Sequence, residues 1–233
     1  MKRIISISLA IMMIALLAGC SCEQKKTKKN QETTIAWKKG ESLFGSKLKE
    51  YADACKNNTS KDIKAKQKLS TGFGEVAKEK NLDQRIGYTF ADLDGDGTEE
   101  LLVSLIDKKD KLNNYIIAVY QYTGEGIKRL LEGWSKNAYY LMNDKLILNQ
   151  ASGDGDDAEI AKLHMRDGSF EYVSTLAMKY GKKDKINYLY AQVGKPENKK
   201  QYKVTERTWK NICKDWEGQV DIKNVKPIKD FDK

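Results

Sequence analysis

The sequence predicts an α+β domain made mostly of antiparallel β-sheet, with helices at its amino-terminal end and one helix at its carboxy-terminal end. Up to about residue 81 the apolar residues recur at helical spacing, after Leu82 they alternate as in strands, and turn dipeptides then recur at short intervals. No helical segment separates the predicted strands, which excludes a doubly wound parallel sheet. The chain has 233 residues, 40% of them hydrophobic, which is enough for a domain with its own core.

The first helix is predicted from about Glu41 to Cys55, because its apolar residues fall on one face. These residues are Leu43, Phe44, Leu48, Tyr51, Ala52 and Cys55. The polar run 57–60 breaks this helix. A second helical stretch follows, with Ser60 as its expected cap, and it ends near Asn81.

Strands are predicted where the pattern changes. Alternating apolar residues indicate a strand over 86–90, and an unbroken apolar run indicates a central strand over Leu101–Ile106. A β-branched and aromatic run indicates another over Tyr115–Tyr122. Asp167–Gly168 separates the runs 160–165 and 170–180 and is typical of a two-residue hairpin turn.

Two shorter strands are predicted at Ile186–Gln192 and Gln201–Val204, which brings the total to eight or nine antiparallel strands. Thr205 then has the position of an N-cap for a closing helix. The apolar face of that helix carries Trp209, Ile212, Cys213 and Trp216. Residues 40–233 are therefore expected to form a single β-rich domain.

Residues 1–19 have the character of a secretory signal peptide, with a basic start, an apolar run over Ile4–Ala18 and small residues at its end. The apolar run of 15 residues is shorter than the roughly 20 residues that a membrane-spanning helix needs. The four residues Leu17-Ala18-Gly19-Cys20 resemble the lipobox of bacterial lipoproteins. That resemblance implies cleavage before Cys20, a diacylglycerol on its sulfur, and a chain tethered to the extracellular face of the cell membrane.

Residues 20–39 are polar and rich in lysine, which predicts a flexible tether. The tether is either a plain spacer or a segment attracted to anionic lipids or anionic envelope polymers. The net charge is +9, or +7 once Lys2 and Arg3 leave with the signal peptide. Only five of the 42 basic residues are arginine, the residue that base-reading proteins favour, so no nucleic-acid partner is expected.

The four cysteines are Cys20, Cys22, Cys55 and Cys213. With Cys20 lipidated, three remain, and an odd number cannot all pair within one chain. A disulfide between Cys55 and Cys213 would join the first and last helices of the domain. The alternative is two buried thiols, because reduced cysteine packs as a small hydrophobic residue.

The motif Asp92-Leu93-Asp94-Gly95-Asp96-Gly97-Thr98-Glu99-Glu100 is the part of the sequence that carries chemistry. It places acidic residues at positions 1, 3, 5 and 9 of a loop, a glycine at position 6, and at position 7 a residue whose carbonyl can turn inward. Calcium takes six to eight oxygen ligands, and alternate residues of a tight loop can direct carboxylates to a common centre. Position 12 is Val103 where an EF-hand has glutamate, so the loop is not an ordinary EF-hand.

The segment 88–103 resembles the calcium loops of FG-GAP and VCBS-type repeats. The resemblance implies that Asp92, Asp94, Asp96 and Glu100 bind calcium through their carboxylates and Thr98 through its carbonyl. Those families usually form β-propellers, for which the β-structure predicted here is too short, so only the loop is carried over. The alternative is an Asp/Gly-rich turn without an ion. The segment 153–159 has a similar composition, but counted from Asp154 it has Ala158 in place of the acidic residue at position 5 and Glu159 in place of the glycine at position 6.

No nucleophile elbow, phosphate loop or metalloprotease helix is present in the sequence. The whole chain resembles small lipoproteins of low-GC Gram-positive bacteria that carry a DxDxDG loop in a β-rich domain, a resemblance that implies no particular activity. The leading hypothesis is a non-enzymatic, calcium-stabilised surface lipoprotein that binds or scaffolds an envelope component. The alternative is an envelope hydrolase that uses His164, the one histidine, or a pair of acidic residues.

Overall fold

The computed structural model describes eight stretches of the chain, and all structural statements below concern these residues. They are 37–56, 68–77, 79–107, 114–153, 158–180, 186–192, 201–221 and 225–231. The chain divides into two compact units, residues 1–43 and 44–233. In the first unit the described residues, 37–43, are helical, and everything that follows concerns the second. None of the helices within the described stretches has the length and apolar character that crossing a membrane requires.

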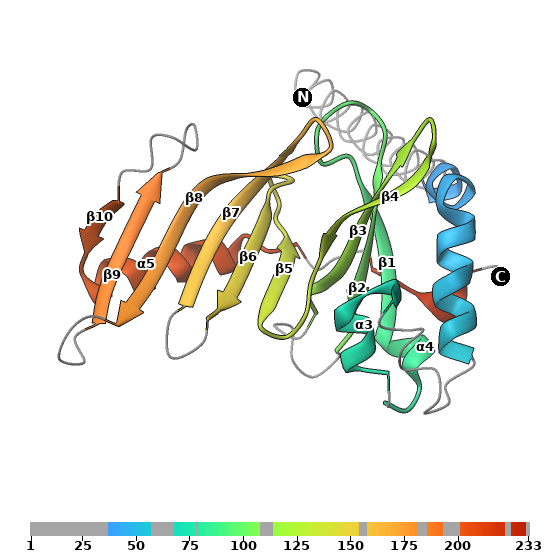
Figure 1. Ribbon diagram of the computed structural model, residues 1–233, viewed down its shortest axis with the longest axis horizontal. Helices are drawn as coiled ribbons and strands as arrows, with labels where there is room; N and C mark the ends of the chain where they lie inside the picture. Colours follow the sequence, from blue (N-terminus) through green and yellow to red (C-terminus); the bar gives the residue numbers. More distant parts are fainter. Residues whose placement is uncertain are drawn as a thin grey trace, which may run out of the picture. The chain divides into compact units, whose positions relative to one another are not determined.

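The fold is α+β and mostly antiparallel β-sheet, as the sequence predicts. Figure 1 shows the strands side by side in one twisted sheet, with helices packed against it. From one edge to the other the order is β10 (Gln201–Val204), β9 (Ile186–Gln192), β8 (Ser169–Tyr180), β7 (Ala158–Arg166), β6 (Ile147–Ser152), β5 (Asn137–Leu141), β3 (Ile116–Thr123), β2 (Glu100–Leu105), β1 (Ile86–Ala91) and β11 (Lys226–Pro227), with β4 (Gly126–Glu132) paired to β3.

The described residues thus form eleven strands where the sequence predicts eight or nine. One strand that the sequence did not predict is β11, which lies far along the chain from β1 and pairs with it through only two residues, Lys226 and Pro227. A strand of two residues has no hydrophobic period, so local sequence cannot reveal it. The hairpin predicted at Asp167–Gly168 is confirmed: it joins β7 to β8, and both residues have the positive φ that such two-residue turns require, 50° and 68°.

Strand β3 connects the two parts of the sheet. One edge of β3 pairs with β2, and its other edge pairs with β4 over most of its length but with β5 through a single residue pair, Ile116 and Tyr139. Gly133, between β4 and β5, lies so close to β3 that an added Cβ would be 2.2 Å from the carbonyl oxygen of Ile116. The absent side chain of Gly133 therefore allows the backbone to pass from β4 to β5 along β3.

Three short or medium helices pack at the β1–β3 end. The first predicted helix is present over residues 37–56, a little longer than expected. It packs on the sheet through Phe44, whose ring centroid is 6.1 Å from that of Phe90, and through Tyr51, 6.3 Å from Tyr120. Helices α3 (Thr71–Glu75) and α4 (Leu82–Arg85) follow. The predicted helical stretch capped by Ser60 lies outside the described residues, and α3 ends earlier than the expected limit near Asn81.

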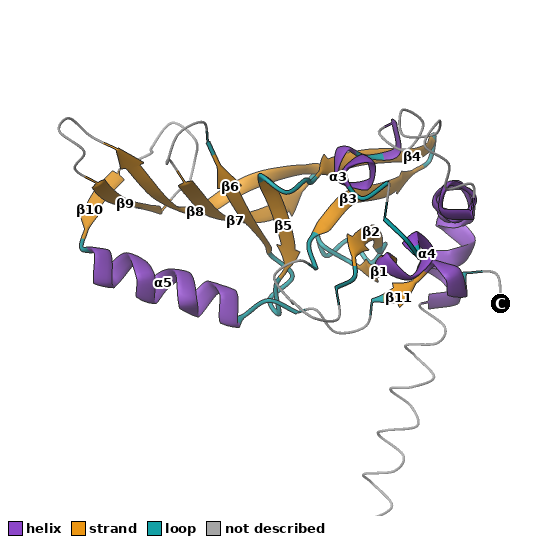
Figure 2. Cartoon of the chain, turned by 90° about the horizontal axis from the view of Figure 1, so that it is seen from below, coloured by secondary structure: helices purple, strands orange, loops and turns teal. Residues whose placement is uncertain are grey.

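Helix α5 (Glu206–Gly218) covers the β6–β9 part of the sheet, as Figure 2 shows. The predicted N-cap is confirmed, because Thr205 Oγ1 accepts a hydrogen bond of 3.1 Å from the backbone N–H of Thr208. Trp209 packs on Tyr188 with ring centroids 5.7 Å apart, and the Lys162 ammonium lies 5.2 Å from the ring centroid of Trp216. The helix ends at Gly218, and the chain then forms β11 at the sheet edge and the short 3₁₀ segment η5 (Ile228–Asp230).

Cys55 and Cys213 are both buried thiols and are not joined in a disulfide, so the pairing considered from the sequence is not present. The reason is topological. Cys55 lies on the helix that packs over β1 and β3, whereas Cys213 lies on α5, which contacts β9 near the opposite edge of the sheet. The alternative weighed from the sequence, two thiols buried in the core, is what the structure has.

Candidate metal centre

The acidic motif forms the loop between β1 and β2. The last residue pair of that hairpin is Ala91 with Glu100, so residues 92–99 make the connection and Glu100 is the first residue of β2. The strand-loop-strand arrangement expected from the sequence is therefore present. Leu93 points into the main core, where it is 2% exposed and clusters with residues of β2, β3, β6 and β7.

Backbone conformation and side-chain hydrogen bonds hold this loop in a tight coil. Gly95 and Gly97 have φ values of 79° and 87°, a region that favours glycine. Three aspartates accept hydrogen bonds from backbone N–H groups of the loop itself: Asp92 from Gly95 at 2.7 Å, Asp94 from Asp96 at 3.2 Å, and Asp96 from Thr98 at 2.6 Å. Each bond orients one carboxylate oxygen and leaves the second for another partner.

The structure brings together three of the five predicted ligands. Carboxylate oxygens of Asp92, Asp94 and Glu100 all lie within 4.8 Å of one another. Asp96 is exposed and stands outside this group. Thr98 donates its N–H to Asp96, and the role predicted for its carbonyl stays a prediction.

Glu100 is the most unusual member of the group. Its residue is 0% exposed, Oε2 accepts the hydrogen bond from Leu93, and Oε1 is buried without a hydrogen-bond partner. Burial raises the pKa of the Glu100 carboxyl to about 7, the Leu93 hydrogen bond opposes the rise, and the charges of Asp94, Asp96 and Asp92 add to it. A buried carboxylate oxygen without a partner destabilises the folded protein. A cation or hydrogen-bond donor that contacted Oε1 would remove this cost and would therefore bind favourably.

Lys145 supplies the one ion pair that the described residues make with these acids. Its Nζ lies 3.6 Å from Oδ2 of Asp92, and its side chain is 59% exposed. Lys145 belongs to the turn between β5 and β6, more than fifty residues away in sequence. The loop pattern gives no signal for this contact.

The three gathered carboxylates fit a hard divalent cation. Such ions take oxygen ligands, and calcium in particular accepts several carboxylates in irregular geometry, whereas magnesium demands near-octahedral geometry and retains water. The donor set contains no sulfur or imidazole, the ligands that zinc and copper favour. The second acidic segment, 153–159, is described only at its ends, and its residues 154–157 lie outside the described residues.

His164 lies in β7, part-buried and directly across from Glu171 in β8. Within the described stretches, no hydrogen bond or ion pair reaches its imidazole. A serine–histidine pair at hydrogen-bond distance, the usual sign of a nucleophilic site, is thus not formed at His164 by the residues described.

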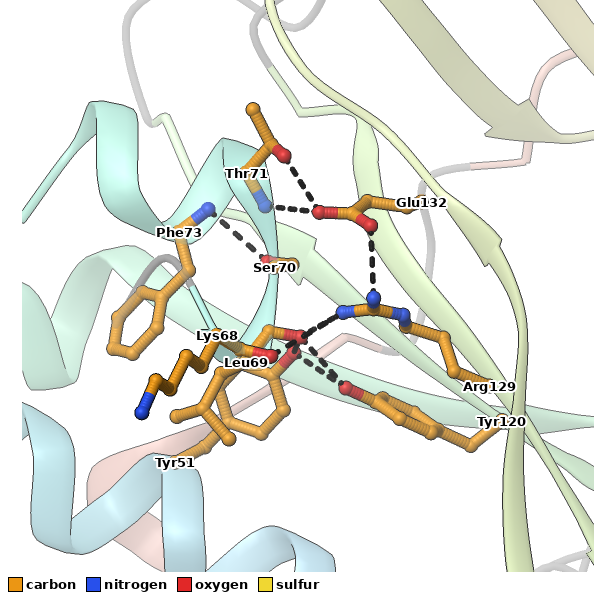
Figure 3. Close-up of polar contacts among 9 residues, drawn as sticks. All are labelled: Tyr51, Lys68, Leu69, Ser70, Thr71, Phe73, Tyr120, Arg129 and Glu132. Carbon is orange, nitrogen blue, oxygen red and sulfur yellow. Dashed lines mark hydrogen bonds and ion pairs between the residues drawn. The ribbon is translucent and has the colours of Figure 1, made fainter. Parts of the chain in front are cut away.

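A polar network that the sequence did not indicate lies between the first helix and β3 (Figure 3). Tyr51 and Tyr120 share a hydrogen bond of 3.0 Å between their hydroxyls, and Tyr120 also donates to the carbonyl of Leu69 at 3.0 Å. Burial raises the pKa of both phenols. Arg129 donates to the same carbonyl at 2.8 Å and pairs with Glu132 at 3.0 Å. The network fastens the chain before α3 to the sheet.

A concave region of about 480 Å³ lies elsewhere, between the first helix, the start of α4 and η5. Its apolar lining includes Cys55, Leu82 and Ile228, and lysines and aspartates surround the opening. None of the five predicted metal ligands lines it. Its mixed charge does not indicate one class of ligand.

The comparisons with known proteins found no match: no family model, no curated protein and no solved structure is similar to this chain at a significant level.

Proposed function

We propose that this protein is a lipid-anchored extracellular protein whose β-rich domain is stabilised by a calcium ion bound in the loop 92–100, with a non-enzymatic binding or scaffolding role in the cell envelope. The ion would be held by the carboxylates of Asp92, Asp94 and Glu100, with Asp96 and the Thr98 carbonyl completing the set as the loop resemblance implies. Its role is structural, because the ligands sit on a hairpin loop anchored in the core by Leu93.

The observation that supports this proposal most strongly is the buried Glu100. Its Oε1 has no hydrogen-bond partner, and two further carboxylates lie within 4.8 Å of its carboxylate. A carboxylate in that position is costly without a cation, since burial and neighbouring negative charge both oppose ionisation. A bound divalent cation removes both costs at once. Loops of extracellular modules bind calcium at roughly 10⁻⁴–10⁻³ M, which suits a site that is filled only outside the cell.

Calorimetry and thermal unfolding test the metal site directly, using the full chain in detergent solution with and without calcium. We expect heat of binding and a stability gain of about 2.7 kcal/mol when free calcium is about 100 times Kd. The double variant Asp94→Ala with Asp96→Ala should lose both. Asp215→Ala is the matched control, because Asp215 lies on α5 and bonds Gln219 there. No binding heat and no stability gain for the wild type would refute the calcium site.

The anchor is tested separately. Growth of the producing cells with a labelled fatty acid should label the wild-type chain, and Cys20→Ala should abolish the label. Cys22→Ala is the control, because it removes a neighbouring cysteine and leaves the lipobox intact. Label that persists in Cys20→Ala would contradict the lipoprotein proposal while leaving the metal site untouched.

The hydrolase alternative stays a prediction, and no observation in the structure favours it. It is checked by assaying glycan, peptide and ester substrates with the wild type and with His164→Ala. Activity that His164→Ala abolishes would replace the non-enzymatic proposal.

A further inference from the structure

We propose that Lys145 is a built-in counter-ion of the acidic loop, and that its ammonium lowers the affinity of the loop for divalent cations. This inference rests on the proposed metal function and names a residue that tunes it. Its starting point is the contact between Lys145 Nζ and Asp92 Oδ2 at 3.6 Å. Asp92 is one of the three acids that the structure gathers.

The backbone of Lys145 is held in place by a tight turn. Met142 donates its N–H to the carbonyl of Leu146 at 2.9 Å, and Lys145 donates its own to the carbonyl of Met142 at 3.1 Å. Lys145 has a φ of 65°, in the left-handed region. Met142 is 2% exposed and anchors the turn in the core.

The same turn is joined to the end of α5. The N–H of Asn143 donates to the carbonyl of Gln219 at 2.9 Å, and the N–H of Asp221 donates to the carbonyl of Leu141 at 2.8 Å. The backbone of Lys145 is therefore held by hydrogen bonds within its own turn and by hydrogen bonds between that turn and the segment that follows α5, which is distant in sequence. This arrangement presents the ammonium to the metal loop and does not depend on the loop itself.

The electrostatic balance then sets the sign of the effect. Asp92, Asp94, Asp96 and Glu100 bring like charges together, and within the described part of the chain Lys145 is the basic residue that forms an ion pair with them. Without a metal ion, the ammonium offsets part of the repulsion. When a divalent cation enters, the ammonium either stays beside a second positive charge or moves into solvent and gives up its pair. Both courses weaken binding.

The size of the effect is bounded by exposure. Lys145 is 59% exposed at its side chain, so solvent screens the interaction and a moderate effect is expected. Replacing Lys145 by glutamine should tighten calcium binding about three- to tenfold. The difference should shrink with salt, because the screening length falls from about 20 Å at about 20 mM to about 4 Å at about 500 mM NaCl.

The experiment compares four forms of the full chain in detergent solution by calorimetric calcium titration at those two salt concentrations. They are the wild type, Lys145→Gln, Lys145→Arg and Lys203→Gln. Glutamine keeps an unbranched side chain at the left-handed position, so the turn is not changed by the substitution. Arginine keeps the charge. Lys203→Gln removes the same charge from β10, at the opposite edge of the sheet from β1.

We expect Lys145→Gln to bind more tightly at low salt, with most of the gain lost at high salt, and Lys145→Arg and Lys203→Gln to bind like the wild type. If Lys145 acted only by holding the turn, the tighter calcium binding of Lys145→Gln would not depend on salt, and Lys145→Arg would not keep the wild-type affinity. If the wild type binds calcium and Lys145→Gln binds equally or more weakly, the inference on Lys145 is overturned and the metal function stands. If no form binds calcium, both are overturned.

Discussion

The backbone N–H of Leu93 donates a hydrogen bond of 2.9 Å to Oε2 of Glu100, which joins the second residue of the β1–β2 loop to the first residue of β2. Leu93 places its side chain in the core, while Glu100 directs a buried carboxylate toward the two gathered aspartates. The contact therefore connects the candidate metal centre with the core of the sheet. Any ligand held by Glu100 should change the stability of the whole domain.

Glu100→Gln should separate two effects on the free energy of unfolding: the destabilisation by the buried negative charge and the stabilisation by bound calcium. Its amide oxygen can still accept from Leu93, while the charge is gone. In a calcium chelator at pH 8 we expect the variant to be more stable than the wild type by about 1–3 kcal/mol, and calcium should no longer stabilise it. Urea unfolding with chelator and with calcium measures both effects. Glu99→Gln is the matched control, and a stability gain from calcium that is as large in Glu100→Gln as in the wild type would exclude Glu100 as a ligand.

The stability of the calcium-free protein should depend on pH through Glu100. Its pKa is raised from 4.5 to about 7, so the folded state holds this proton more tightly than the unfolded chain. The contribution to stability is fully present below about pH 4.5 and is lost as the pH rises through about 7, by on the order of 3 kcal/mol in total. Urea midpoints across this range, measured in chelator for the wild type and Glu100→Gln, give the contribution as a difference. Parallel curves for the two proteins would contradict it.

Tyr120→Phe should destabilise the domain by about 1–2 kcal/mol. The substitution removes the hydroxyl that bonds both Tyr51 and the Leu69 carbonyl, and it leaves the buried Tyr51 hydroxyl with one partner fewer. Tyr122→Phe is a matched control on the same strand, because Tyr122 is 41% exposed. Chemical unfolding at pH 7 compares the two. Equal stabilities of Tyr120→Phe and Tyr122→Phe would show that the hydrogen bonds of the Tyr120 hydroxyl do not stabilise the domain.

The two buried cysteines should be unreactive in the folded protein. Burial raises the pKa of the Cys213 thiol to about 11, so only about one molecule in a thousand carries the thiolate at pH 8. In a chain with Cys20 and Cys22 replaced by serine, we expect almost no reaction with a thiol reagent until denaturant is added. Two thiols per chain should then react without any reductant. A count near zero would instead show that Cys55 and Cys213 form a disulfide in the secreted protein.

Much of the fold could be predicted because its signals are local. Thr205 caps α5, Asp167–Gly168 turns β7 into β8, and Ile186–Gln192 is a strand with the predicted limits. Each depends on side chains and backbone preferences within a few residues. The acidic loop belongs to the same class, since its spacing predicts the sharp turn at Gly97 and the approach of Asp92 and Asp94.

The sequence by itself determined most of the helix and strand segments, the Asp167–Gly168 hairpin and the acidic loop, because each is set by periodicity or turn chemistry over short distances. Only the tertiary structure decided that Glu100 is fully buried, that Lys145 reaches Asp92, and that Cys55 and Cys213 lie on helices near opposite edges of the sheet. These relationships join residues that are far apart along the chain, and they depend on the order in which strands pair. Strand order depends on which faces of the sheet are buried against other elements, and the pattern of residues within one strand does not reveal this.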